Sequence, residues 1–122
     1  MANQSAALSD VFYALADPTR RAIVAALGRG PTSVSTLALP FPMALPSFMK
    51  HLGVLERSGL VRSRKAGRVR TCELEPRALT QAGRWLAEQR AVWEARTDRL
   101  ARFAETLPVE DPPHDRRARR TE

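Results

Sequence analysis

Basic side chains gather in one short stretch of this chain, and their density suits binding to a polyanion. Residues 50–77 contain eight Lys and Arg against three Glu, which leaves a local charge of +5. The first 49 residues and residues 78–107 carry only +1 each. Clustered positive charge is the electrostatic footprint of nucleic-acid binding, and an aromatic content of 6% is low for a protein that stacks unpaired bases. The competing interpretation is a basic surface that is merely solvated.

Some of these cations lie on a predicted helix over residues 44–58. Phe48, Leu52 and Leu55 recur at the spacing i, i+4, i+7 and should face the core. Gly59 should follow the helix as a left-handed cap. An α-helix with a polar outer face fits the major groove of B-DNA, where base edges can be read. The side chains left on that outer face are Ser47, Lys50, His51 and Val54.

Most of the remaining cations lie on a predicted β-hairpin. Residues 60–65 and 69–74 alternate apolar and polar side chains, and a tight turn at 66–68 joins them. Val61 and Val69 should anchor the hairpin to the core. A basic hairpin of this kind can reach along a DNA backbone. The side chains expected to project to solvent are Arg62, Arg64, Arg68 and Arg70.

Short helices must precede this helix–hairpin pair and position it. Residues 5–16 have apolar side chains at helical spacing and predict a first helix. Asp17 should cap a second helix that begins at Pro18, because proline at the first helical position needs no hydrogen-bond donor. A short third helix is expected over residues 34–38. Its candidate caps are Thr32 and Ser33.

A long last helix is expected from about Arg77 to Leu107. A heptad stripe over such a length is typical of a helix that pairs with another subunit. Packing against the chain's own first helix is the alternative, and the two arrangements are compatible. The apolar or aromatic residues that recur every seven positions are Leu79, Leu86, Trp93, Leu100 and Leu107.

Four helices, a hairpin and a last helix predict a mainly α fold with a small β-hairpin, the winged helix–turn–helix. The 122 residues should form one domain over residues 1–107, followed by a disordered, charged tail over 108–122. No apolar run could span a membrane and no secretory signal is evident, so cytoplasmic residence is expected. The sequence contains no nucleophile with a placed base and no phosphate loop, so neither enzymatic activity nor a cofactor is expected.

Three segments of the chain resemble the ArsR-type bacterial transcriptional regulators. They read LADPTRRAIVAAL at 15–27, MALPSFMKHL at 43–52 and VLERSGLVRSRKAGRVRTCEL at 54–74. They follow the family's order and spacing, and the resemblance covers roughly residues 8–100. It implies a homodimer, joined through its first and last helices, that acts as a repressor at a palindromic operator. The implied dimer contacts lie at Leu8, Phe12, Leu79, Leu86, Trp93, Leu100 and Leu107.

The resemblance also implies which residues face DNA. The helix over 44–58 matches the family's recognition helix, and the hairpin over 60–74 matches its wing. The family usually has polar side chains where Ala44, Leu45 and Met49 stand here, so its operator sequences cannot be carried over. The implied DNA contacts are Ser47, Met49, Lys50, His51, Arg62, Arg64, Lys65, Arg68 and Arg70.

Metal sensing is familiar in this family but is not expected here. Residues 36–43 lack the cysteines of the family's thiolate site, and residues 77–107 lack the histidines of its other site. Zinc or a soft metal needs three or four converging nitrogen or sulfur ligands. The chain offers only Cys72, His51 and His114.

Other functions stay open alongside DNA binding. The long last helix could hold a partner protein, which would make the chain an adaptor. Cys72 could sense oxidants, because the nearby Arg70 would favour its thiolate, although a buried apolar role on the strand is the competing interpretation. A small-molecule inducer of unknown identity is left open as a further partner.

Overall fold

The computed structural model describes residues 2–108, with side chains from residue 6 onward. The chain divides into two units, Met1–Leu86 and Ala87–Glu122, each described by itself below. The single domain expected over residues 1–107 therefore stays a prediction. The charged tail expected over 108–122 lies, apart from Pro108, outside the described residues. No helix in the described range is both long and apolar enough to cross a membrane.

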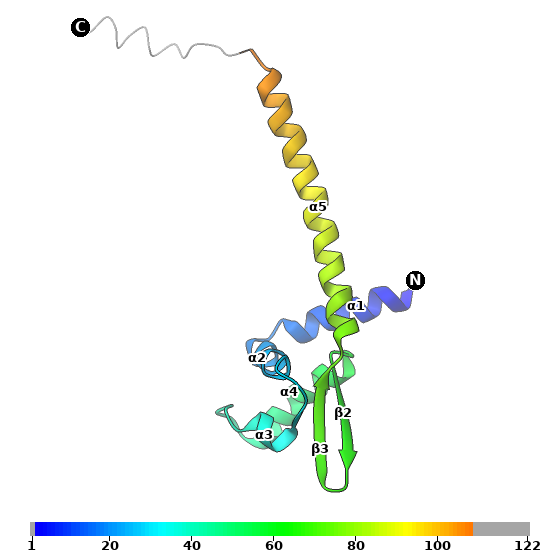
Figure 1. Ribbon diagram of the computed structural model, residues 1–122, viewed down its shortest axis with the longest axis vertical. Helices are drawn as coiled ribbons and strands as arrows, with labels where there is room; N and C mark the ends of the chain where they lie inside the picture. Colours follow the sequence, from blue (N-terminus) through cyan, green and yellow to red (C-terminus); the bar gives the residue numbers. More distant parts are fainter. Residues whose placement is uncertain (1, 109–122) are drawn as a thin grey trace, which may run out of the picture. The chain divides into compact units, whose positions relative to one another are not determined.

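The elements follow the predicted order, with one addition (Figure 1). The helices α3 and α4 with the connector between them form the helix–turn–helix, and the strands β2 and β3 form the wing. This confirms the mainly α, winged helix–turn–helix fold. The bounds are α1 (Ala2–Leu15), α2 (Pro18–Leu27), β1 (Thr32–Ser33), α3 (Val34–Ala38), α4 (Leu45–Arg57), β2 (Val61–Ala66), β3 (Val69–Leu74) and α5 (Pro76–Thr106).

Two of the helix starts are fixed by side-chain caps, as predicted. The Asp17 carboxylate accepts a hydrogen bond from the backbone N–H of Arg20 at 3.0 Å, which caps α2. The hydroxyl of Ser33 likewise accepts from the N–H of Thr36 at 3.2 Å and caps α3. Helix α4 differs, because its N-cap residue Ala44 has no side chain that can accept a hydrogen bond. Its first turn is therefore left without a side-chain cap.

The sheet has three strands in the order β1-β3-β2, one strand more than the predicted hairpin. Strand β1 pairs with β3 through Thr32 opposite Cys72 and Ser33 opposite Thr71. Two residues are too few to show an alternating pattern, and their partner lies about forty residues further on, so the sequence did not predict this strand. Gly67 adopts a φ of +63° in the turn between β2 and β3, a conformation that favours glycine.

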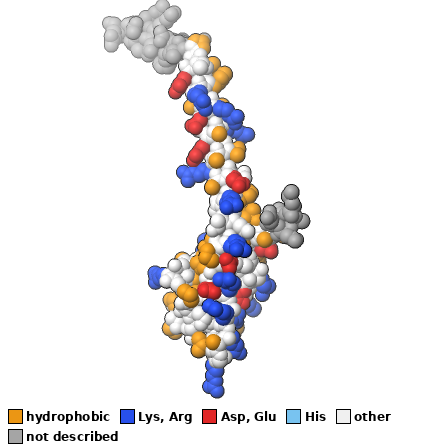
Figure 2. Space-filling model, turned by 45° about the vertical axis from the view of Figure 1, so that its right-hand side comes forward, with side chains coloured by type: hydrophobic (Ala, Val, Ile, Leu, Met, Phe, Trp, Pro, Cys, Tyr) orange, Lys and Arg blue, Asp and Glu red, His pale blue; other side chains and the backbone are white. Residues whose placement is uncertain are grey.

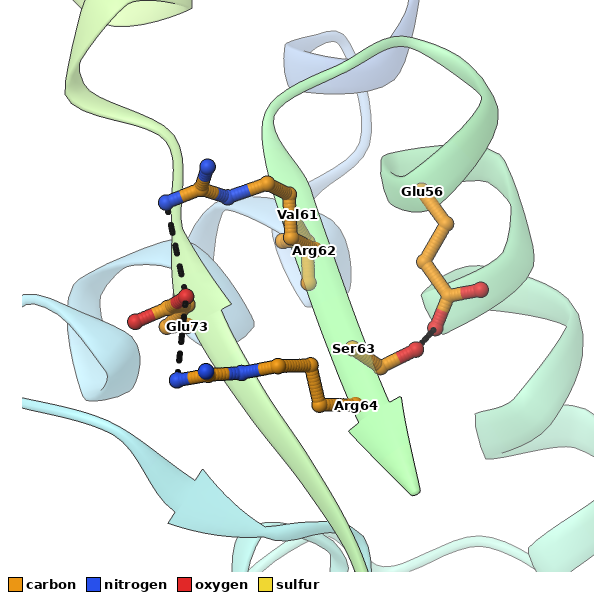
Figure 3. Close-up of a pocket in the computed structure, with 6 residues that line it drawn as sticks. All are labelled: Glu56, Val61, Arg62, Ser63, Arg64 and Glu73. Atoms are coloured by element: carbon orange, nitrogen blue, oxygen red, sulfur yellow. Dashed lines mark hydrogen bonds and ion pairs between the residues drawn. The ribbon is translucent and has the colours of Figure 1, made fainter. Parts of the chain in front are cut away.

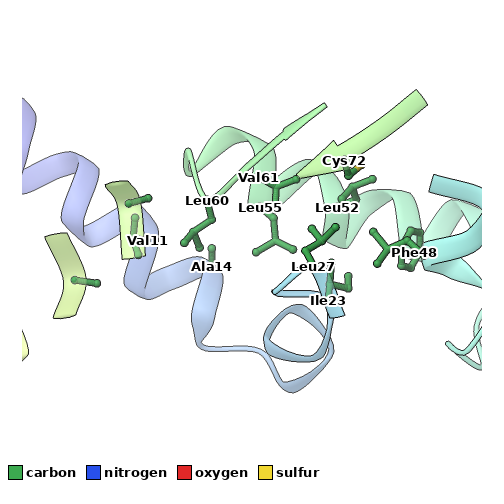
Figure 4. Packing of buried hydrophobic residues seen from close by; sticks show 13 residues of the cluster. Val11, Ala14, Ile23, Leu27, Phe48, Leu52, Leu55, Leu60, Val61 and Cys72 are labelled. Carbon is green, nitrogen blue, oxygen red and sulfur yellow. The ribbon is translucent and has the colours of Figure 1, made fainter. Parts of the chain in front are cut away.

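The core of the first unit is built around one face of α4 (Figure 4). Phe48, Leu52 and Leu55 are almost fully buried, as their spacing predicts. They pack with Ile23 and Leu27 from α2 in a single hydrophobic cluster. No polar or charged residue among those described is buried in this core. The cluster therefore holds the opposite face of α4 toward solvent. Further members are Val11, Ala14, Leu37, Leu60, Val61, Cys72, Ala78 and Ala82.

The wing is anchored differently from the prediction. Val61 is buried as expected, but Val69 is 54% exposed and does not anchor the hairpin. Val69 pairs with Ala66 next to the turn, on the face of β3 opposite to that of Cys72. Cys72, which is fully buried, takes the anchoring role on β3. The predicted inward face of this strand was therefore out of phase by one residue.

Helix α5 begins packed against the first unit. Ala78 and Ala82 are buried, and Leu79 packs partly against the core. The rings of Phe12 and Trp85 meet edge to face with 5.6 Å between their centroids. Packing of this helix against the chain's own first helix, one of the two expected arrangements, is thus confirmed for its first turns. In the second unit, every described residue of α5 from Ala87 onward is exposed.

Candidate nucleic-acid interface

The outer face of α4 carries fewer available groups than the sequence predicts. Ser47 and Lys50 are exposed, as expected. Met49 is half-buried and packs partly against the hydrophobic core. His51 is also half-buried, with its Nδ1 atom 3.6 Å from Oδ2 of Asp17. Of the four residues expected to approach bases on this helix, two are turned at least partly toward the protein.

His51 belongs to a polar cluster that joins α4 to the first two helices. Nη1 of Arg20 lies 3.4 Å from His51 Nδ1. The same guanidinium donates from Nε to the Ala14 carbonyl at 2.8 Å and from Nη2 to the Tyr13 carbonyl at 3.2 Å. The backbone N–H of Arg20 holds the pKa of Asp17 below its usual value. Arg20 thus satisfies carbonyls at the end of α1 while it faces the recognition helix.

The wing carries several exposed cations of the first unit. Arg64, Lys65 and Arg68 are exposed on the hairpin, and Arg68 lies in its turn. Figure 2 shows Lys and Arg side chains along this hairpin and at its tip. These positions agree with the expected contacts to a DNA backbone. Phosphate contacts of this kind hold a protein in register on the duplex without reading its sequence.

Arg62 is exposed but is partly neutralised by carboxylates. Its guanidinium lies 3.1 Å from Glu75 and 3.4 Å from Glu73, and Arg64 lies 3.8 Å from the same Glu73 oxygen. Figure 3 shows the contacts of Arg62 and Arg64 with Glu73 beside an open depression of about 680 Å³ next to β2, which Glu56 and Ser63 also line. Cations and carboxylates alternate there, so the depression has no marked preference for either charge.

Arg70 does not project to solvent, and that prediction is wrong. Its Nη2 donates to Oε2 of Glu56 on α4 at 2.7 Å and also pairs with Oε1. The Ser63 hydroxyl donates to Glu56 Oε1 at 2.9 Å and accepts from Arg70 Nε at 3.1 Å. Side chains alternate along a strand, so Arg70 shares the inward face of β3 with Cys72. The prediction assigned the faces of β3 one residue out of phase, and this one error explains why both Val69 and Arg70 were placed on the wrong face.

Cys72 lies in the hydrophobic core with no exposed surface. Burial raises the pKa of its thiol, and the Glu56 carboxylate raises it further, while Arg70 acts weakly in the opposite direction. Arg70 does favour the thiolate, as expected, but burial outweighs its effect and the net shift of the Cys72 pKa is upward. A reactive sensor thiol needs a low pKa and access to solvent, and this thiol has neither.

Within residues 2–108 the structure brings no three His, Cys, Asp or Glu side chains together as a metal site. His51 is occupied with Asp17 and Arg20, and Cys72 is buried among apolar side chains. His114 lies outside the described range. The donors that the sequence offers are thus on separate parts of the fold wherever they are described.

Comparisons with known proteins agree with this geometry. A helix-turn-helix domain family model matches residues 15–64. The HTH-type transcriptional regulator Rv2034 of Mycobacterium tuberculosis is 47% identical over 68 residues, which cover 56% of this chain and 64% of that protein. The chain thus matches slightly less than two thirds of that relative's length. The transcriptional repressor SdpR of Bacillus subtilis is 28% identical over 79 residues, 65% of this chain and 88% of that one.

Solved structures extend the likeness to most of the chain. The crystal structure of an ArsR family transcriptional regulator, RHA00566, is 57% identical and covers 74% of this chain and 93% of its own, with a TM-score of 0.70. An ArsR-like transcriptional regulator from Rhodococcus sp. RHA1 is 35% identical over 86% of this chain and 99% of its own, with a TM-score of 0.72.

The winged helix–turn–helix and its exposed basic wing define the class, which is that of DNA-binding regulators. Given its identity to RHA00566 over nearly all of that chain, the protein belongs to the ArsR family of transcriptional regulators. Membership in this family, whose members regulate transcription, also answers the question of activity: the protein is a regulator and not an enzyme.

Proposed function

We propose that the protein is a homodimeric repressor that binds a palindromic operator through α4 and the wing. The observation that carries this proposal is the arrangement of the first unit. One solvent-facing side of α4 carries Ser47 and Lys50, and the neighbouring wing carries Arg64, Lys65 and Arg68, all exposed. A recognition helix that reads bases beside cations that hold phosphates is the working arrangement of a winged helix–turn–helix.

Within this proposal the residues have different roles. Ser47 and Lys50 approach base edges and neighbouring phosphates, while Arg64, Lys65 and Arg68 contact the backbone. Met49, His51 and Arg62 take secondary parts, because each is half-buried or already paired. Arg70 is withdrawn from the set of contacts, because it is bound to Glu56. The wing thus acts mainly on affinity, and α4 acts mainly on specificity.

We propose that dimerisation uses α5, together with α1. Trp93 and Leu100 are 65% and 63% exposed on the part of α5 in the second unit. Leu86, in the first unit, is similarly uncovered. Large apolar side chains left in solvent at heptad spacing favour pairing with a second helix. Leu8, Phe12 and Leu79 are already partly packed against the core of their own chain, so they support the interface more than they form it.

Repression and the palindrome follow from symmetry and from one relative. SdpR of Bacillus subtilis is a transcriptional repressor, and we extend that activity to this chain. A two-fold dimer places its two recognition helices in equivalent positions, so its operator should contain two inverted half-sites. Successive major grooves on one side of the duplex are about 34 Å apart, which sets the half-site spacing.

The proposed signal is not a metal ion. This rests on the donor set of the described residues, in which His51 and Cys72 are engaged separately. Titration of the operator complex with Zn²⁺, and dialysis against a chelator, should leave its dissociation constant unchanged. A tenfold or larger metal-dependent release would contradict this part of the proposal. A small-molecule inducer remains open.

Footprinting on the DNA upstream of the protein's own coding sequence, with mobility shifts across a salt series, tests the main proposal. We expect a short palindromic footprint. Lys50, Arg64, Lys65 and Arg68 of both subunits would together neutralise about eight phosphates. The logarithm of the association constant should then fall with the logarithm of the salt concentration at a slope of about −7. Weak binding that ignores sequence, on this and on genome-selected DNA, would contradict the proposal and favour an adaptor that acts through α5.

A further inference from the structure

The first turn of α4 is apolar and exposed. Ala44, Leu45, Pro46 and Ser47 all face solvent, and only Ser47 among them has a polar side-chain group. Leu45 is 56% exposed, although it lies three residues before the buried Phe48 on the same helix. Residues at this spacing share a helix face. Leu45 therefore extends the apolar stripe of α4 one turn beyond the core, where the first unit does not cover it.

We propose that Leu45 binds the C5-methyl group of a thymine in each operator half-site. The inference rests on the proposed function and specifies what the start of the recognition helix reads. Residues at the N-terminal end of such a helix contact base edges. In the major groove, the apolar group that an ordinary base pair presents is the thymine methyl. An exposed leucine can form no hydrogen bond there, so its contribution to specificity is apolar contact.

The surroundings of Leu45 favour DNA over a protein as the occupant. Lys50 is exposed further along α4, and Arg64, Lys65 and Arg68 are exposed on the wing of the same unit. Exposed cations on the same helix and on the wing of the same unit match a groove lined with phosphates better than they match the apolar surface of a second copy. The base 5-methylcytosine carries the same methyl group, and we commit to thymine as its source.

Single-atom changes in the operator test this contact. Each thymine of the footprinted operator is replaced in turn by deoxyuridine, which removes the methyl group and keeps base pairing. Burial of one such carbon contributes about 0.8 kcal/mol, which corresponds to about fourfold in affinity. We expect one or two thymines per half-site at which the replacement weakens binding about fourfold, and no effect at thymines outside the α4 footprint.

Protein variants assign the effect to Leu45. With Leu45→Ala, overall affinity should fall, and the replacement of those thymines by deoxyuridine should have no further effect. Leu39→Ala is the matched control, since Leu39 is 80% exposed and lies outside α4. That variant should keep the fourfold sensitivity of the wild type. Both changes lie on exposed side chains, so both proteins should fold.

Four outcomes would overturn the inference. Specific binding that deoxyuridine leaves unchanged throughout the α4 footprint would reject it and leave the proposed function intact. If replacement by deoxyuridine weakened the binding of wild type and of Leu45→Ala equally, the thymine methyl group would contact another residue. If deoxyuridine had no effect but methylation of an operator cytosine tightened binding, the base that Leu45 contacts would be 5-methylcytosine and not thymine. Absence of specific binding to any duplex would reject both the inference and the proposed function.

Discussion

Arg70 on β3 and Glu56 on α4 form an ion pair in which one nitrogen, Nη2, contacts both carboxylate oxygens and lies 2.7 Å from Oε2. Ser63 on β2 hydrogen-bonds both partners. The three side chains join the recognition helix to both strands of the wing. Charge-assisted hydrogen bonds of this kind are short and stronger than neutral ones, so the cluster helps to fix α4 relative to the wing.

Breaking this pair should lower the stability of the fold without removing a phosphate contact. The two side chains are 37% and 24% exposed, between the surface and buried cases. We therefore expect Arg70→Ala to lower the free energy of unfolding by about 1–2 kcal/mol, measured by chemical denaturation. DNA affinity should fall with an almost unchanged salt slope, because Arg70 contacts no phosphate. A flattened slope at full stability would identify Arg70 as a phosphate contact instead.

Arg68→Ala is the contrasting change at the tip of the wing. This side chain is exposed, so stability should stay within about 0.5 kcal/mol of wild type. Binding should weaken equally for all DNA sequences. The loss of two phosphate contacts per dimer should also change the salt slope from about −7 to about −5. Mobility shifts at four salt concentrations, on operator and unrelated duplexes, measure this. An effect confined to the operator would indicate base reading by the wing.

Trp93→Ala should weaken the dimer before it affects the winged unit. Trp93 is exposed on α5, and truncation of an aromatic anchor in an interface typically costs about 2 kcal/mol or more. Sedimentation or mass photometry across a dilution series should show at least a tenfold weaker dimer. Glu88→Ala, on another side of the same helix, is the control. A Trp93→Ala protein that stays fully dimeric at nanomolar concentration would exclude this stripe as the interface.

Cys72 should react slowly in the folded protein. Its raised pKa and complete burial keep the thiol protonated and out of contact with reagents. Labelling by a thiol reagent at pH 8 should therefore wait for unfolding and accelerate in denaturant. The unfolded chain ionises first as pH rises above the ordinary cysteine value of about 8.5, so stability should decline there and not below it. Peroxide that released the operator from wild type but not from Cys72→Ser would restore the redox-sensor alternative.

Several elements could be predicted from sequence because short-range rules fix them. Asp17-Pro18 starts α2, Ser33 caps α3 and Gly59 follows α4 with a φ of +83°. Phe48, Leu52 and Leu55 assign the inner face of α4, because 3.6 residues per turn leave one apolar stripe. Each of these signals lies within a few residues of the element that it defines. The order of elements, and with it the winged helix–turn–helix, followed from them.

The phase of β3 could not be obtained in this way. Val69-Arg70 and Thr71-Cys72 alternate in a manner that fits either face, and only packing against the helical core selects the face that holds Cys72. With Cys72 on the inner face, Val69 is exposed and Arg70 lies toward Glu56. Strand β1 and the contact of Arg20 with His51 likewise join residues far apart in the sequence.

The sequence by itself determined the basic helix–hairpin unit, the core face of α4 and the family, since local spacing and composition carry them. Tertiary structure alone decided which cations remain available. It paired Arg70 with Glu56, drew His51 toward Asp17 and left Arg64, Lys65 and Arg68 in solvent. The physical reason is that a side chain's charge is fixed by its type, whereas its partners depend on elements that meet only when the chain folds.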